Sequence, residues 1–180
     1  MNSSSVNALT YLVGTLIDLY VASVLLRLLL QWVRADFYNP LSQLLIRLTN
    51  PALVPLRRII PSIGRLDTAS VVLMLALEFI GVWLAGKIGS SAMEWQQIIA
   101  FSVIKLLMTL LMTYFFLIIV AVILSWLGQG LRHPFIPLVF QLTEPVLRPI
   151  RRVIPPIAGI DLSPLFALIA IRFLMLLLGW

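Results

Sequence analysis

The chain has 180 residues, of which 61% are hydrophobic and 11% are charged, and its formal net charge is +6. Soluble domains average about 45–50% apolar and about 25% charged residues, so this composition excludes a soluble globular enzyme. The mean hydropathy of +1.07 excludes a disordered chain. The absence of cysteine excludes disulfides, thiolate metal sites and cysteine nucleophiles. We therefore expect a small polytopic membrane protein.

Four apolar stretches are candidates for membrane spans. They cover residues 9–33, 68–85, 98–127 and 162–180. Crossing a hydrocarbon core of about 30 Å takes about 20 helical residues. The third stretch exceeds this length, so it must tilt or project from the bilayer. The sequence predicts an all-α membrane protein with four transmembrane helices.

Two loops, residues 34–67 and 128–161, differ from the spans because they hold ten of the eleven prolines. Proline removes an amide donor and clashes with the preceding turn, so we expect short helices joined by bends in each loop. Asn39-Pro40 and Asn50-Pro51 each resemble a helix start, with a capping residue before a proline at the first helical position.

One segment of the first loop has the spacing of an amphipathic helix. Its apolar residues recur at positions i, i+3, i+4 and i+7, namely Leu41, Leu44, Leu45 and Leu48. Such a helix could lie in the lipid headgroup region or pack on the protein's own spans. We expect amphipathic interfacial helices in both loops.

The basic residues of the loops predict the orientation of the chain. Together the loops hold nine arginines, at positions 34, 47, 57, 58, 65, 132, 148, 151 and 152. The segment between the second and third spans carries only Lys87 and Glu94. By the positive-inside rule, both loops lie in the cytoplasm and both termini lie outside, in the cell inner (plasma) membrane.

The chain repeats itself with an offset of 94 residues. Trp32 aligns with Trp126, and residues 49–67 align with residues 143–161 without a gap. Loops that shared only a basic, proline-rich character would not keep this register. We predict a tandem duplication, with repeat 1–94 (spans 9–33 and 68–85) and repeat 95–180 (spans 98–127 and 162–180). Each repeat has two spans, so both share one orientation.

Each repeat carries the motif T-x-P-x-L-x-P-[LI]-R-R-[IV]-I-P-x-I-x-x-x-D. Besides the arginines, its most distinctive identical positions are Thr49, Pro51, Pro55, Pro61 and Asp67, with Thr143, Pro145, Pro149, Pro155 and Asp161. This motif resembles that of the YggT (YGGT) family of small integral membrane proteins, which includes YlmG proteins encoded near cell-division genes. The resemblance implies a role in membrane organisation, osmotic-stress tolerance or assembly, without enzymatic activity.

The paired arginines of the motif are candidate binding residues: Arg57 and Arg58 in the first copy, Arg151 and Arg152 in the second. Guanidinium groups beside apolar residues can hold lipid phosphates, and each adds about 1 kcal/mol near an anionic leaflet. Two alternatives stay open, namely that they only set the topology or that they bind an acidic site on a partner protein. No aromatic interleaving supports nucleic-acid binding.

Ionisable residues inside the spans form a second candidate site. Asp18 lies about 22 Å from the cytoplasmic end, whereas Glu78 and Arg172 lie about 15 Å from it. Glu78 and Arg172 are equivalent in the two copies, so we expect a buried ion pair or, alternatively, an ion or proton pathway that includes Asp18. Arg27 is expected to snorkel to the interface, and Lys105 to reach the outer face.

We therefore expect a non-catalytic protein without cofactor or metal. The lone histidine, His133, precedes Pro134 and fits a helix-capping role better than a metal ligand. The expected partners are anionic phospholipid and a membrane, cell-division or assembly protein, and the oligomeric state is left open. The alternative is a small ion channel or transporter component that uses Asp18, Glu78 and Arg172.

Overall fold

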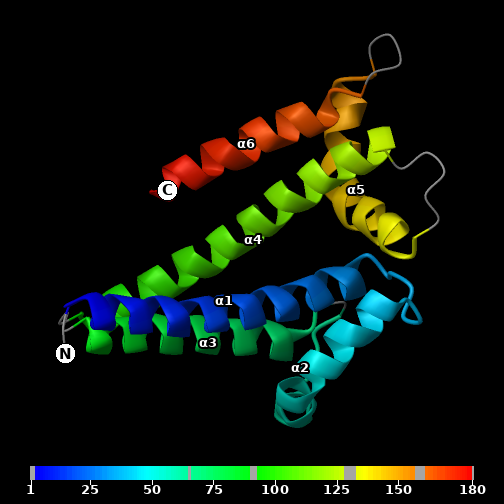
Figure 1. Cartoon of the computed structure of the whole chain (residues 1–180). Helices are drawn as coiled ribbons and strands as arrows, with labels where there is room; N and C mark the ends of the chain where they lie inside the picture. Colours follow the sequence, from blue (N-terminus) through cyan, green and yellow to red (C-terminus); the bar gives the residue numbers. More distant parts are fainter. Residues whose placement is uncertain (1–2, 65, 90–92, 128–132, 157–160, 180) are drawn as a thin grey trace. The chain divides into compact units, whose positions relative to one another are not determined.

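The computed structural model describes residues 3–64, 66–89, 93–127, 133–156 and 161–179. Arg65 and Arg132, two of the nine loop arginines, lie outside the described residues. The described part of the chain forms six helices, namely α1 (Ser3–Trp32), α2 (Pro40–Ile59), α3 (Thr68–Ile88), α4 (Trp95–Leu127), α5 (Phe135–Val153) and α6 (Ser163–Leu177) (Figure 1). These residues contain no β-strand, only an isolated bridge between Ile63 and Leu66. The prediction of an all-helical fold is confirmed.

Three helices of the described chain, α1, α3 and α4, are long and apolar enough to cross a membrane. They extend beyond the apolar stretches that predicted them, because backbone hydrogen bonding continues through polar residues at their ends. The fourth predicted span holds α6, which has 15 residues and is therefore about 22 Å long. Because this is shorter than a hydrocarbon core of about 30 Å, the fourth crossing stays a prediction.

The predicted breaks at the loop prolines are wrong. α2 is one helix that contains Pro51 and Pro55, and α5 is one helix that contains Pro145 and Pro149. In each helix the two prolines are four residues apart and both are exposed. The backbone carbonyls that lose their donors therefore lie on one outward face, where other donors can reach them, so the helix continues.

The helices α2 and α5 carry most of the loop arginines and are called the basic helices below. Each begins next to a capping side chain. Asn39 Oδ1 accepts a hydrogen bond from the Leu41 amide at 3.0 Å, which confirms the predicted start at Pro40. The second predicted start, at Asn50-Pro51, is wrong because both residues lie inside α2. His133 Nδ1 accepts a hydrogen bond from the Phe135 amide at 3.2 Å, which confirms its capping role at α5.

The leucine stripe predicted for the first loop divides between two environments. Leu45 is buried, whereas Leu44 and Leu48 are exposed. Part of the stripe therefore packs on the protein, and part remains free to contact another apolar medium.

The chain forms two compact units, which are described separately. The first consists of Met1–Leu28 and Leu45–Thr109, and the second of Leu29–Leu44 and Leu110–Trp180. These units divide the chain at other points than the predicted repeats, and the repeat boundary near residue 94 stays a prediction.

Each unit has its own apolar core. In the first unit the core joins parts of all four of its helices, with buried residues that include Val21, Val24, Leu53, Met74, Ile98 and Met108. In the second unit α5 packs against α6. Buried side chains of these two helices include Leu138, Leu142, Leu147, Ala167, Ile171 and Met175.

Gly81 of α3 faces Ile17 of α1 in the first unit. A Cβ atom built at Gly81 would lie 3.4 Å from Ile17 Cδ1 and 3.5 Å from Ile17 Cγ2. In contrast, a Cβ atom built at Gly14 of α1 would have no heavy atom within 4 Å. The two glycines therefore form a matched pair for testing this contact.

We expect Gly81→Leu to lower the free energy of unfolding by about 1–3 kcal/mol, because the added side chain overpacks the contact with Ile17. Gly14→Leu is the control, and we expect no loss because the site is open and leucine favours a helix. Thermal unfolding of the detergent-solubilised proteins measures both. Equal losses at the two positions would contradict the α1–α3 contact.

Candidate functional site

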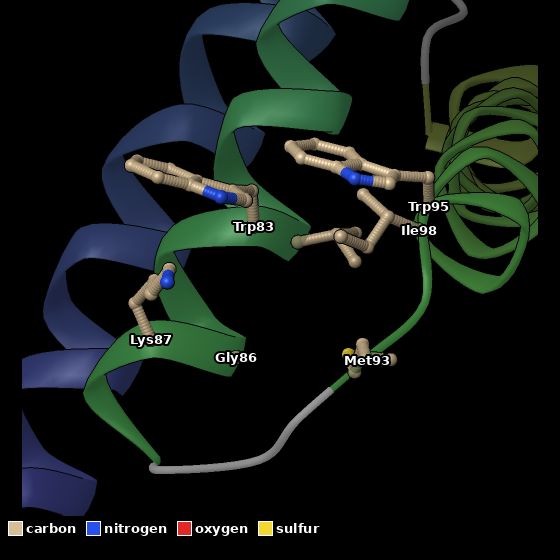
Figure 2. A pocket seen from close by; sticks show the side chains of 7 residues that line it. Trp83, Gly86, Lys87, Met93, Trp95 and Ile98 are labelled. Atoms are coloured by element: carbon tan, nitrogen blue, oxygen red, sulfur yellow. The ribbon is translucent and has the colours of Figure 1, made fainter.

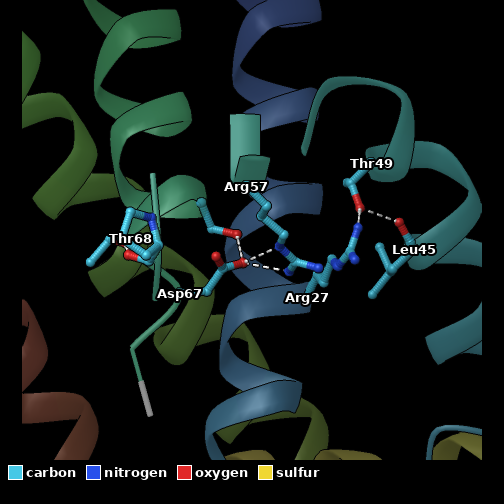
Figure 3. Close-up of polar contacts among 8 residues, drawn as sticks. Arg27, Leu45, Thr49, Arg57, Asp67 and Thr68 are labelled. Carbon is cyan, nitrogen blue, oxygen red and sulfur yellow. Dashed lines mark hydrogen bonds and ion pairs between the residues drawn. The ribbon is translucent and has the colours of Figure 1, made fainter. Parts of the chain in front are cut away.

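Asp67 connects the end of α2 to the beginning of α3. Its Oδ2 atom accepts hydrogen bonds from Arg57 Nη2 at 2.5 Å, Arg57 Nε at 3.2 Å and Ser70 Oγ at 2.5 Å (Figure 3). The Asp67 side chain is only 1% exposed. Nearby, Thr68 Oγ1 donates to the carbonyl oxygen of Pro61 at 2.5 Å. The motif residues Arg57, Pro61 and Asp67 therefore fix the turn between a basic helix and a candidate span.

The hydrogen bonds at Asp67 keep its carboxylate ionised. Burial alone would raise the pKa of Asp67, but the hydrogen bonds from Arg57 and Ser70 and the charge of Arg57 outweigh it. The pKa therefore lies below the ordinary value for aspartate. A buried carboxylate with this arrangement is a structural ion pair rather than a proton donor.

Arg27 extends the network from α1. Its Nη1 atom donates to Thr49 Oγ1 at 2.6 Å, and the Thr49 hydroxyl donates in turn to the Leu45 carbonyl oxygen at 2.6 Å (Figure 3). Arg27 is 9% exposed. A hydroxyl acceptor inside the protein holds this side chain, and the expectation that it snorkels to the interface stays a prediction. Thr49 thus links α1 to α2.

The same ion pair occurs in the second copy of the motif. Arg151 Nε donates to Asp161 Oδ2 at 3.0 Å, and Asp161 Oδ1 accepts from the Ser163 amide at 2.9 Å at the start of α6. Thr143 Oγ1 donates to the Val139 carbonyl at 3.0 Å, as Thr49 does to Leu45. Equivalent residues of the two copies therefore make equivalent contacts.

The second ion pair is more open than the first. The Asp161 side chain is 34% exposed, and Arg151 also lies 3.4 Å from Glu144 Oε2. Burial would raise the pKa of Asp161, but the hydrogen bonds from Ser163 and Arg151 lower it below the ordinary value. The Arg151–Asp161 ion pair is therefore chemically the same as the Arg57–Asp67 ion pair, but it is more exposed to solvent.

The two arginines of each predicted pair therefore make different contacts. The first member, Arg57 or Arg151, belongs to an ion pair, whereas the second member, Arg58 or Arg152, is exposed. Each exposed arginine is followed by a branched aliphatic side chain that is 80% exposed, Ile59 in α2 and Val153 in α5. A guanidinium group beside an exposed apolar residue therefore marks the end of each basic helix.

A cluster of charges lies among the candidate spans of the first unit. Lys105 Nζ of α4 lies 2.5 Å from Asp18 Oδ1 of α1 and 3.0 Å from Glu78 Oε2 of α3. Asp18 and Glu78, singled out from the sequence, are therefore brought together, and Lys105 joins them. Arg172 is exposed on α6 of the second unit, and its pairing with Glu78 stays a prediction.

Lys105 was missed as a site residue because its depth was counted along α4 from the cytoplasmic end. α4 has 33 residues, so its length is about 50 Å and exceeds any bilayer core. A tilted or projecting helix places its residues at depths that sequence counting overestimates. The available signal was charge: Lys105 is the single basic residue of its span, and two acidic residues occur in neighbouring spans.

A pocket of about 270 Å³ lies where α3 approaches the beginning of α4 (Figure 2). Its lining residues are Val82, Trp83, Gly86, Lys87, Met93, Trp95 and Ile98. The Trp95 ring stacks on Phe79 with centroids 6.2 Å apart, and Lys87 Nζ lies 6.0 Å from the centroid of a Trp83 ring. This lining has no carboxylate, and no group of three or more metal-ligating side chains occurs in the described residues.

The sequence model of the CCB3/YggT family matches residues 6–88 and again residues 100–180. The chain belongs to the CCB3/YggT family. The double match covers both copies of the motif. Together with the three long apolar helices, it identifies a membrane protein.

Bacterial relatives match this YggT-family chain over most of its length. An uncharacterised protein of Pseudomonas aeruginosa is 44% identical over 94% of this chain and 87% of its own. The protein YggT of Escherichia coli K12 is 41% identical over 88% of this chain and 82% of its own. A Vibrio alginolyticus protein is 40% identical, with coverage of 96% and 94%. These names state no activity, and no solved structure matches the chain.

We expect Asp67→Asn to lower the free energy of unfolding at neutral pH by about 1.5–3 kcal/mol, because it removes a charge-assisted hydrogen bond from a buried site. The pKa of Asp67 is lowered in the folded state, so its contribution is complete above about pH 4 and disappears as the pH falls through the folded-state value. Asp161→Asn is the comparison, and we expect a smaller loss because Asp161 is one-third exposed.

Denaturation of the detergent-solubilised proteins at several pH values measures this dependence. The difference in the free energy of unfolding between the native protein and Asp67→Asn should become smaller as the pH falls below about 4. A difference that stays constant well below about pH 4 would show that the charge of Asp67 does not stabilise the fold.

Proposed function

We propose that this YggT-family protein is a non-catalytic membrane-organising or assembly factor that holds anionic lipid through its two basic helices. The observation that supports it is the exposure of Arg58 beside Ile59 in α2 and of Arg152 beside Val153 in α5. The preceding arginine of each pair is already neutralised by an aspartate. Each helix therefore keeps an arginine that carries no ion pair among the described residues.

Lipid phosphate suits this arrangement chemically. A guanidinium group presents a planar set of donors that matches a phosphate, and an exposed aliphatic neighbour can enter the apolar edge of the headgroup layer. Each basic residue near an anionic leaflet contributes about 1 kcal/mol. Arg47 and Arg148 are also exposed on the same helices and would add to the attraction.

The orientation follows from the same residues. We place α2 and α5 at the cytoplasmic face of the cell inner membrane, both termini outside, and α6 as a short fourth crossing. The support is the excess of arginine in the two loops, together with the apolar character of all four spans. A partner that assembles in the membrane would meet the same basic surface as the lipid.

The alternative function is a small ion channel or transporter component. The cluster of Asp18, Glu78 and Lys105 supports it, because charged residues among spans often line ion pathways. Ion flux through vesicles that contain the purified protein distinguishes this function from a non-conducting assembly factor.

Single cysteines test the orientation. We expect Ser62→Cys, in the loop after α2, to react only when a membrane-impermeant thiol reagent reaches the cytoplasmic side. Ser4→Cys, near the beginning of α1, should react from the outside. The native chain has no cysteine, so it provides the unlabelled control. Labelling of Ser62→Cys in intact cells would reverse the proposed topology.

The double variant Arg58→Gln with Arg152→Gln tests lipid binding. We expect it to lose most of the preference for anionic over neutral phospholipid, measured as lipids retained by the detergent-solubilised chain in native mass spectrometry. The matched control, Arg47→Gln with Arg148→Gln, removes the same charge from the same helices and should lose less. If the Arg58→Gln, Arg152→Gln variant retains as much anionic lipid as the native chain, these two arginines act only as topology signals. The native preference should also weaken as salt concentration rises.

A further inference from the structure

Glu78 is a buried acid that neither the fold nor the proposed function explains. Its residue is 0% exposed, and neither carboxylate oxygen has a hydrogen-bond partner in the described chain. Lys105 Nζ lies 3.0 Å from Oε2 as an ion pair, but not in the alignment of a hydrogen bond. The hydrogen bond from Lys105 goes to Asp18 at 2.5 Å instead.

The charges of this cluster do not balance. Among the described residues of the first unit, Asp18 from α1 and Lys105 from α4 are the charged groups close to Glu78, so two carboxylates share one ammonium group there. Glu78 lies at the middle of α3, a candidate span of 21 residues. An uncompensated charge in the middle of a membrane span is unfavourable, because hydrocarbon does not solvate it.

Lys105 compensates the negative charge of Asp18 better than that of Glu78. The Asp18 side chain accepts the short hydrogen bond from Lys105, so its charge is paired through an aligned hydrogen bond. Glu78 is fully buried and accepts no hydrogen bond from the described residues. Of the two acids, Glu78 therefore gains more from becoming neutral.

A proton compensates this charge better than a metal ion. Calcium and magnesium need about six or more oxygen ligands. No group of three or more metal-ligating side chains occurs in the described residues, and this cluster supplies two carboxylates beside a competing ammonium group. A proton needs only one carboxylate oxygen.

We propose that Glu78, buried in α3, binds one exchangeable proton next to the partly exposed Lys105–Asp18 ion pair. The step adds a proton from solvent to one carboxylate oxygen of Glu78, forms an O–H bond and breaks no other bond. The cluster then holds one ammonium group, one carboxylate and one neutral carboxylic acid. This inference is independent of lipid binding by α2 and α5.

Infrared spectroscopy of the full chain in lipid vesicles tests the proton directly. At neutral pH we expect the C=O stretching band of one protonated carboxylic acid per chain. It should shift when glutamate is labelled with carbon-13 and stay in place when aspartate is labelled. The band should be lost in Glu78→Gln and kept in Glu94→Gln, where an exposed glutamate is replaced.

A second variant tests the charge balance. Asp18→Asn leaves one carboxylate beside Lys105, so Glu78 should ionise and the band should disappear at neutral pH although Glu78 is present. Glu78→Gln is neutral like the protonated acid, so its thermal unfolding should match that of the native chain and confirm a folded sample. The proposal is overturned if the native chain shows no protonated carboxylic acid at neutral pH, if the band shifts with aspartate labelling, or if it survives in Glu78→Gln.

Discussion

The ion pair between the first arginine of each motif and the aspartate ten residues later is the contact on which the basic helices depend. Successive residues of an α-helix point about 100° apart. Arg57 turns toward Asp67, whereas Arg58, the next residue round the helix, is exposed, and Arg151 and Arg152 differ in the same way. A structural ion pair thus determines which guanidinium groups remain for a ligand.

The sequence was sufficient for the helical membrane class, the repeated motif and the caps at Asn39 and His133, because these depend on composition, register and local hydrogen bonds. The pairing of Arg57 with Asp67 was not predictable, because a turn lies between them and its path is set by tertiary contacts. A better signal was the constant spacing of the two residues in both copies. Lys105 was misplaced because helix tilt has no sequence periodicity.

The two copies use one motif with different degrees of burial. Asp67 is enclosed and receives a serine hydroxyl as well as Arg57, whereas Asp161 is partly open, and its Arg151 also approaches Glu144. The two copies of the motif thus form two ion pairs of the same chemistry. The first copy also contributes Arg27 and Thr49 to its network, so its basic helix is attached to α1 as well as to α3.

The prolines inside α2 and α5 limit how deeply these helices can enter a bilayer. Pro51 and Pro55 leave the carbonyl oxygens four residues before them without a helical donor, on the exposed side of α2, and Pro145 and Pro149 do the same in α5. Hydrocarbon offers no hydrogen-bond donor, so this face must stay among water and lipid headgroups. In the orientation proposed for this protein, each proline pair keeps its helix at the membrane surface.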